Sequence, residues 1–418
     1  MSEHPSRRSI RVPLTGIDNT QYEVPRRRSA SVSRRRLFGT LCSMIFLVNL
    51  GRVVFAPLLG EFITVFRIGE GTVGMIATLA WLGSAIPRVP TGWLLTRVPR
   101  HRVILATGAI LTAASLFIAS ATSVAMVAVG ALSMGLASGV YFVAANPLVS
   151  ELYPERVGWA IGIHGMTSQI AAAAAAPLVT LVLTLFLDWR IVFVTIAVAA
   201  AAVTLTLFFV ARSTTLPDAG AADRDVIAAI RSEWRVVGLG VVVVGATGFV
   251  WQGLFNFYEL YMVTKGLSEP TAKNLLTVIF AAGVPAFFVS GRLVDALPRV
   301  PYILAIITGF TACVLALTVT TGLVPIVALT AVIGYVLHSL FPAVDTYLLD
   351  SLPDESRASA YAWYSGGMMV IQATGSSAVG ALRETGLAYD AIFTQLSLGL
   401  LAVVAGLLVL QRTGRLPQ

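Results

Sequence analysis

Long apolar segments separated by short polar ones dominate the chain. Twelve of these segments are about as long as the 20 residues that a helix needs to cross a bilayer. Their apolar residues run on continuously, whereas a membrane β-strand alternates apolar and polar positions. The expected spans are 38–60, 72–95, 103–122, 124–150, 159–186, 189–210, 236–258, 271–291, 301–320, 323–349, 358–381 and 390–411. The pattern therefore predicts an all-α membrane protein with twelve transmembrane helices.

Composition excludes the two or three soluble domains that 418 residues would otherwise suggest. Hydrophobic residues make up 56% of the chain and charged residues 12%, about half the charged share of a soluble protein. Its two cysteines, Cys42 and Cys313, lie in apolar segments without a Cys/His cluster, so we expect no metal and no cofactor. The sequence shows no nucleophile motif or phosphate-binding loop, and we expect no enzymatic activity.

The net charge of +8 raises the question of nucleic-acid binding. Nucleic-acid binding needs basic residues on a folded face with interleaved aromatic residues. Here nine arginines precede Leu37, in a tail rich in serine and proline that adjoins the first apolar segment. We therefore expect a tail held by anionic membrane lipid, and no nucleic-acid partner.

The distribution of Lys and Arg predicts the orientation in the membrane. With the N-terminus inside, the internal segments hold 22 of these residues and the external loops hold 5. Cationic residues concentrate on the cytoplasmic side of a membrane, so both termini are expected in the cytoplasm and the protein in the cell membrane. The expected parts are a disordered tail 1–36, a six-helix half 37–211, a central loop 212–235, a second half 236–411 and a tail 412–418.

The two halves repeat in sequence. The stretch GWLLTRVPR at 92–100 aligns with GRLVDALPR at 291–299, an offset of 199 positions. ELYPE at 151–155 aligns with DSLPD at 350–354 at the same offset. Repeated halves with a binding site between them are the architecture of alternating access.

The stretch 92–100 resembles the signature loop between the second and third spans of the major facilitator superfamily. The second copy at 291–299, the Asp-Trp-Arg at 188–190 and the central loop agree with this, and the resemblance covers about 37–411. It implies two six-helix halves, a monomer, and secondary active transport by alternating access. The acid of the signature loop is Thr96 in the first copy and Asp295 in the second.

Charges at the cytoplasmic rim are candidates for a gate, because ion pairs are strong when dry and weak when hydrated. By resemblance, Asp295 would face Arg156 across the halves. The candidates are Arg97, Arg100, Glu151, Arg156, Asp295, Arg299, Asp350 and Arg357. The alternative is that these are loop charges that serve orientation alone. At the opposite rim, Glu61 and Glu259 are expected as exposed charges.

Two arginines lie at membrane depth, Arg52 in the first span and Arg88 in the second. An arginine there is costly and normally faces a cavity or a partner. In the other half, Arg52 aligns near Gln252 and Arg88 with Phe287. A guanidinium binds carboxylate or phosphate through two parallel donors, so the pair predicts an asymmetric anion site. The alternative is a structural role for each arginine, satisfied by helix carbonyls or by an acid.

Asp345 is an acid in the tenth span, where the first half has Asn146. An acid at this depth is either protonated or paired with an arginine, and a protonatable acid suits proton coupling. His338 lies seven residues earlier on about the same helix face. We expect Asp345 and His338 to carry protons. The alternative for Asp345 is an ion pair with an arginine, and the alternative for His338 is ordinary packing.

By resemblance to the family, polar and aromatic residues on the first, fourth, seventh and tenth spans should line the solute cavity. These candidates are Asn49, Tyr141, Asn146, Trp251, Gln252 and Asn256. Such residues also occur in ordinary helix packing.

The expected function is secondary active transport of a small anionic solute, coupled to protons or to a counter-anion. One alternative is a proton-coupled exporter of amphipathic compounds. An aromatic cavity lined by acidic residues would favour this alternative. A more remote alternative is a membrane sensor that does not transport.

Overall fold

The computed structural model describes residues 26–214, 226–353 and 356–414, and all regular structure in these ranges is helical. The first half contains α1 Arg26–Val53, η1 Ala56–Leu58, α2 Leu59–Phe66, α3 Glu70–Ala85, α4 Arg88–Leu94, α5 Arg100–Ala119, α6 Val124–Leu152, η2 Pro154–Arg156, α7 Val157–Phe186 and α8 Arg190–Arg212. The second contains α9 Val226–Asn256, α10 Tyr258–Thr264, α11 Glu269–Ala296, α12 Arg299–Val319, α13 Leu323–Ser351, α14 Arg357–Glu384 and α15 Tyr389–Arg412.

Ten helical segments of the described residues are long and apolar enough to cross a membrane. The helices α11 and α14 are not among these ten, but each has 28 residues. At 1.5 Å per residue this is about 42 Å, which exceeds the thickness of a bilayer core. The architecture is therefore the twelve-helix arrangement that the sequence predicts.

Three of the predicted spans are each built from more than one helix. The first consists of α1, η1 and α2, the second of α3 and α4, and the seventh of α9 and α10. Pro57 lies in η1, and Pro87 lies between α3 and α4. Proline has no backbone N–H and interrupts helix hydrogen bonding. The break at Pro87 places Arg88 at the first position of α4, in the middle of the molecule.

Two helices extend beyond the limits expected for the membrane halves. The helix α1 already begins at Arg26, so part of the tail expected to be disordered is helical. The second half begins with α9 at Val226 instead of residue 236. Hydropathy does not detect these extensions, because they lie outside the apolar segments; the division into domains stays a prediction.

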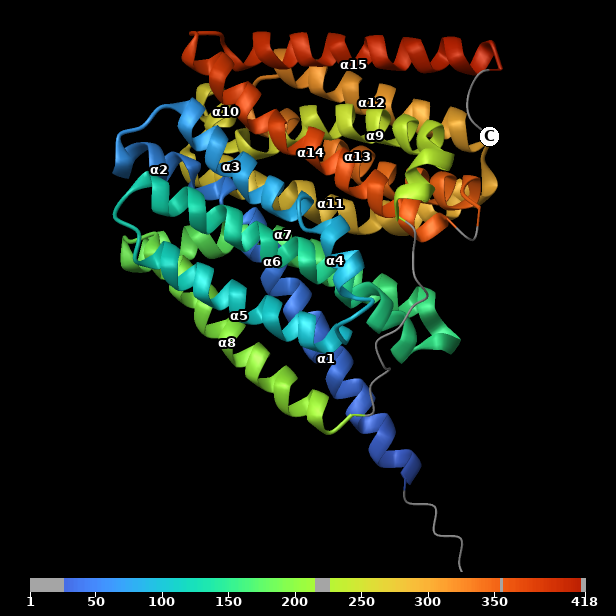
Figure 1. Ribbon diagram of the computed structural model, residues 1–418. Coiled ribbons are helices and arrows are strands. Elements are labelled where there is room, and N and C mark those ends of the chain that lie inside the picture. Colours follow the sequence, from blue (N-terminus) through green and yellow to red (C-terminus); the bar gives the residue numbers. More distant parts are fainter. Residues whose placement is uncertain (1–25, 215–225, 354–355, 415–418) are drawn as a thin grey trace, which may run out of the picture.

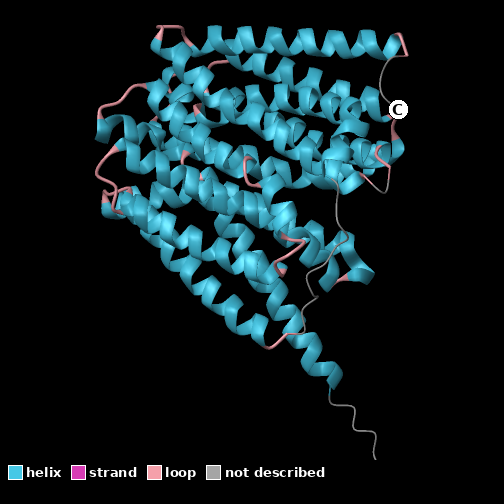
Figure 2. Ribbon diagram, in the orientation of Figure 1, coloured by secondary structure: helices cyan, strands magenta, loops and turns pink. Residues whose placement is uncertain are grey.

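The halves α1–α8 and α9–α15 form the lower and upper parts of the molecule in Figure 1. They contact each other where α3 and α4 pack on α14, and where α7 packs on α11. The halves lie together at the left and diverge toward the right, and the loops gather at these two ends (Figure 2). We call them the Glu70 end, at the left, and the Arg100 end, at the right.

The 199-residue repeat is visible in the helix packing. In the first half, a Cβ on Gly135 would lie 2.1 Å from the carbonyl oxygen of Ala80. In the second half, a Cβ on Gly334 would lie 2.3 Å from the carbonyl oxygen of Ile279. Both members of the second contact lie 199 positions after those of the first, so the same glycine-mediated helix crossing is built twice.

Candidate solute site and the two ends of the bundle

Arg52 lies on α1 among polar and aromatic groups of its own half. Its Nη2 donates to Asn49 Oδ1 at 2.6 Å, and its Nη1 donates to Ser84 Oγ at 3.3 Å. The guanidinium carbon lies 4.1 Å from the ring centre of Trp81, a cation–π distance. Among the described residues, its Nε is buried and has no hydrogen-bond partner. The guanidinium is therefore positioned by neighbours that leave one donor free.

Arg88 bridges the two halves beside Arg52. Its Nε donates to the Ser84 carbonyl oxygen at 3.3 Å, and its Nη1 donates to the hydroxyl of Ser365 on α14. Ser84 therefore contacts both arginines, one through its side chain and one through its backbone. The two charges repel each other. A site with two adjacent guanidiniums favours an anion that neutralises them.

Asp345 on α13 is the acid that faces this pair from the second half. Its carboxylate accepts a hydrogen bond from the Tyr361 hydroxyl and interacts electrostatically with Arg88. The ion pairs among the described residues do not include one between Arg88 and Asp345. The centre of the protein therefore combines two guanidiniums with one carboxylate and has an excess of positive charge.

Aromatic rings connect Arg52 with His338 across the halves. Trp81 meets Phe255 edge to face, with ring centres 6.3 Å apart. Phe255 stacks on Trp251 at 5.5 Å, and Trp251 lies 6.1 Å from the His338 ring. His338 is 3% exposed, and its Nδ1 lies 2.6 Å from the carbonyl oxygen of Gly334. We call this series the aromatic ladder.

The remaining solute candidates occupy different surroundings. Tyr141 is fully buried and donates to the Leu41 carbonyl oxygen at 2.6 Å. Asn256 donates to the Gln252 carbonyl oxygen and to Ser376 Oγ, both at 2.9 Å, in the contact between α9 and α14. Asn146 is exposed. The structure thus brings Arg52, Asn49 and Trp251 into one network and places Tyr141, Gln252 and Asn256 in helix contacts; their roles in solute binding stay predictions.

At the Arg100 end, two ion pairs occupy equivalent positions in the repeat. Arg100 pairs with Glu151 at 2.8 Å, and Arg299 pairs with Asp350. Both residues of the second pair lie 199 positions after those of the first, and each pair stays within its own half.

The other gate candidates make no cross-half ion pair in the described part: Arg97 stacks on Trp93 at 3.9 Å, Arg156 is exposed, and the side chains of Asp295 and Arg357 lie outside the described residues. Their gate role stays a prediction.

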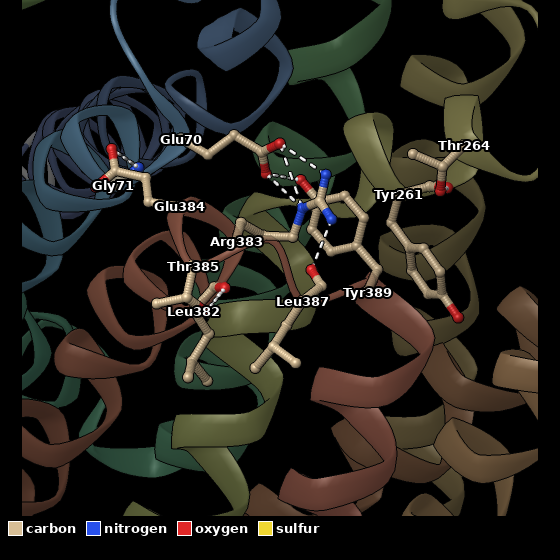
Figure 3. Close-up of polar contacts among 10 residues, drawn as sticks. All are labelled: Glu70, Gly71, Tyr261, Thr264, Leu382, Arg383, Glu384, Thr385, Leu387 and Tyr389. Atoms are coloured by element: carbon tan, nitrogen blue, oxygen red, sulfur yellow. Dashed lines mark hydrogen bonds and ion pairs between the residues drawn. The ribbon is translucent and has the colours of Figure 1, made fainter.

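At the Glu70 end, charged groups connect the halves directly (Figure 3). Arg383 on α14 donates through Nε and Nη2 to the carboxylate of Glu70 on α3, each at 3.1 Å at its closest. The Tyr389 hydroxyl donates to the same carboxylate, and the Gly71 N–H donates to Glu384 Oε1 at 3.0 Å. Sequence reasoning missed this contact because each residue reads as an ordinary charge near a loop, and 313 positions separate Glu70 from Arg383.

Hydroxyl groups continue this contact along the helices. Thr78 on α3 donates to the carbonyl oxygen of Ala373 at 2.8 Å and accepts from Ser377 Oγ at 2.7 Å. On the other helix pair, Thr277 of α11 donates to the carbonyl oxygen of Ala173 on α7 at 3.0 Å. The available sequence signal was the presence of Thr and Ser within apolar spans, which is too common to identify a contact.

The expectation that Glu259 is an exposed rim charge is wrong. Glu259 on α10 is only 2% exposed. Its Oε1 lies 3.4 Å from Nζ of Lys273, which is 3% exposed. Lys273 also contacts Glu269 at 3.2 Å. Glu259 lies in α10, the short helix that completes the seventh span, and its carboxylate is enclosed there together with the Lys273 ammonium. Pattern reasoning failed here because Gly60 of the other half lies against this carboxylate: a Cβ on Gly60 would lie 3.3 Å from Glu259 Oε1.

Comparison with known proteins supports the fold. The sequence matches the Major Facilitator Superfamily over residues 41–334 and 266–417. It is 28% identical over 117 residues to the galactose-proton symporter of Escherichia coli (strain K12), which is 28% of this chain and 25% of the symporter, so only about a quarter of that relative is matched. The galactose-proton symporter of Escherichia coli O6:H1 matches to the same extent.

Solved structures share the fold along most of the chain. A bacterial homolog to the human lysosomal transporter Spinster, in an inward-facing and unoccupied conformation, superposes with a TM-score of 0.69 at 16% identity. The match covers 90% of this chain and 95% of that one. Its occupied inward-facing structure gives a TM-score of 0.67 at 17% identity, with the same coverage. The chain belongs to the Major Facilitator Superfamily, a family of membrane transporters and not of enzymes.

Proposed function

We propose that this protein is a secondary active transporter that moves a small anionic solute by alternating access, with Arg52 and Arg88 as its anion-binding groups. The observation that carries the proposal is the pair of guanidiniums that both contact Ser84, one with a buried Nε that has no hydrogen-bond partner among the described residues. Such a pair is costly in a membrane protein. A carboxylate or phosphate that receives parallel donors from the pair would offset that cost.

Alternating access requires one end of the site to be closed while the other is open. Here Glu70 and Arg383 join the halves at one end, whereas Arg100 and Glu151 pair within one half at the other. The Lys/Arg distribution assigns the Arg100 end to the cytoplasm, so the conformation corresponds to an inward-facing state. The inward-facing Spinster homolog supports this assignment. Conversion to the outward-facing state would break the Glu70–Arg383 contact.

Coupling to protons is assigned to Asp345. When it is ionised, its carboxylate attracts Arg88; when it is protonated, that attraction is lost and the guanidinium is available to the solute. Solute binding and protonation would thus favour each other, as symport requires. The E. coli galactose-proton symporter offers a precedent for a proton as the coupling ion in a relative.

Export of amphipathic compounds is a second candidate function, and the aromatic ladder favours it. Trp81, Phe255 and Trp251 would offer a flat apolar surface beside the arginines. This candidate predicts that bulky apolar cations bind, whereas the two guanidiniums repel them. The charge of the site therefore favours the anion.

A binding screen on the purified protein tests the proposal. We would compare small carboxylates and organophosphates, a neutral hexose, and amphipathic cations, measuring affinity by calorimetry. The proposal predicts that anions bind, and that amphipathic cations and the hexose do not. Binding of cations alone would favour the exporter function instead. Binding of the hexose alone would refute the proposal that the solute is an anion.

A further inference from the structure

A cavity of about 540 Å3 lies at the Arg100 end, outside the central site. It is formed where the beginning of α1 meets η2 and the beginning of α7. Its volume lies within the range of about 300–1,000 Å3 typical of small-molecule pockets. The solute site, the Arg100–Glu151 pair and the Glu70 end do not use the residues that line it.

One wall of the cavity is aromatic. Phe38 meets Tyr153 edge to face with ring centres 5.1 Å apart and lies 5.8 Å from the Trp159 ring. Tyr153 and Trp159 are 5.6 Å apart. Trp159 is 51% exposed although it is the largest of these side chains. Aromatic side chains with one apolar and one polar face are typical of the headgroup region of a membrane.

The cavity is also lined by cationic side chains. These are Arg34, Arg35 and Arg156, with Glu155 as the one acid. The Arg34 guanidinium lies 4.9 Å from the ring centre of Tyr153. Within the described part of the chain, none of the three arginines makes an ion pair. The cavity therefore has an uncompensated charge of about two positive units.

The contrast with Arg100 shows that this arrangement is not a general property of this end. Arg100 pairs with Glu151, four positions before Glu155, and is largely buried by that contact. Unpaired guanidiniums around one cavity repel one another, and an anion within the cavity would remove that repulsion. The cavity is thus complementary to an anion that also has an apolar part.

We propose that this cavity binds the headgroup of an anionic phospholipid from the cytoplasmic leaflet. Arg34, Arg35 and Arg156 would contact the phosphate, and the ring of Trp159 would contact the glycerol and the first acyl carbons. Anionic lipid is concentrated in the cytoplasmic leaflet, and arginines next to membrane helices attract it. A lipid would contact both the arginines and the aromatic rings, whereas a soluble phosphate would leave the aromatic rings unused. The inference is independent of the transported solute.

Native mass spectrometry of the purified full chain tests this inference. Protein in detergent would be titrated with phosphatidylglycerol, with phosphatidylcholine of the same acyl chains, and with glycerol 3-phosphate as the soluble counterpart. The matched variants are Arg34→Gln/Arg35→Gln/Arg156→Gln and, as a control, Arg212→Gln/Arg235→Gln/Arg412→Gln. The control removes three exposed arginines from the same end, outside the cavity. Melting temperatures would establish that both variants are folded.

The expected result is a preference for phosphatidylglycerol that the control retains and the cavity variant loses. The exposed Arg156→Gln change alone should weaken phosphatidylglycerol binding about five-fold, the effect of one arginine near an anionic surface. Equal phosphatidylglycerol binding by the parent and both arginine variants would overturn the proposal. Binding of glycerol 3-phosphate without a preference between the two lipids would also overturn it, in favour of a soluble anion.

Discussion

The two halves of the protein share a skeleton but differ in chemistry at its centre. Gly135 and Gly334 make the same helix crossing in each half, and the rim ion pairs are also equivalent. At the site, positions 199 apart carry unlike side chains, namely Arg52 and Trp251, Arg88 and Phe287, Trp81 and Phe280, Gly139 and His338, and Asn146 and Asp345. The first half supplies the two cations and Trp81, and the second half supplies the other rings of the aromatic ladder and an acid.

The difference continues at the Glu70 end. Gly60 and Gly74 of the first half occupy the positions of Glu259 and Lys273 in the second. A Cβ on Gly74 would lie 2.5 Å from the carbonyl oxygen of Ser376, so the glycine permits close helix contact. The second half instead has a buried ion pair there. The helix crossings are thus the same in both halves, whereas the residues that face the other half differ. This difference makes the site asymmetric and gives it its positive charge.

The largest expected effect comes from making Asp345 like its counterpart Asn146. Asp345→Asn removes the acid that we propose carries the proton, so solute accumulation driven by a pH gradient should be abolished. Exchange of solute at equal pH needs no proton and should persist. Uptake and counterflow in proteoliposomes measure both; unchanged accumulation under a pH gradient would assign coupling elsewhere.

The buried pair of the second half should respond next most strongly. Lys273→Met leaves the Glu259 carboxylate buried without its cation, which costs about 3 kcal/mol when the carboxyl is ionised. A buried carboxyl without a cation favours its protonated form more strongly than a solvated carboxyl does. The folded variant then retains a proton that the unfolded chain releases, so its stability falls as the pH rises.

The melting temperature of Lys273→Met should accordingly be near that of the parent at pH 5 and clearly below it at pH 9. Glu259→Gln/Lys273→Met, which removes both charges, should recover most of the loss at pH 9. A pH-independent decrease in both variants would mean that Lys273 contributes through packing alone.

The shared skeleton predicts equal effects in both halves. Gly135→Ala and Gly334→Ala would each force a methyl group against a backbone carbonyl and should destabilise by about 1–3 kcal/mol. Gly162→Ala is the control, because a Cβ there meets nothing within 4 Å. Thermal melting in detergent measures all three. A large loss in one half and none in the other would refute the equivalence of the two crossings.

The smallest effect is expected for Arg383→Gln. Glu70 and Arg383 are 25% and 22% exposed, so hydration weakens their ion pair to about 1 kcal/mol. Its loss should shift the population toward the outward-open state about five-fold. Distances between spin labels at the Glu70 end report that population, and Arg67→Gln in the nearby loop is the control. Equal distributions in the two variants would mean that the hydroxyl and backbone contacts alone close this end.

Local periodicity predicted the helical fold, and the constant offset predicted the two halves, because both signals depend on residues close in sequence or in fixed register. The proximity of Arg52 to Arg88 followed from their equal depth. The Glu70–Arg383 contact and the burial of Glu259 did not follow, because they depend on how one half rests on the other. The aromatic ladder was missed for the same reason, since Trp81 and Phe255 belong to different halves.

Anion affinity of Arg52→Lys and Arg88→Lys, measured together with melting temperature, tests the central claim most directly. Lysine keeps the charge but loses the planar pair of donors. Loss of a charge-assisted hydrogen bond costs about 1.5–3 kcal/mol, or roughly ten- to a hundred-fold in affinity. Each variant should therefore bind the anion that much more weakly at an unchanged melting temperature, while Arg67→Lys binds normally. Normal anion binding by both Arg52→Lys and Arg88→Lys would contradict the proposed anion site.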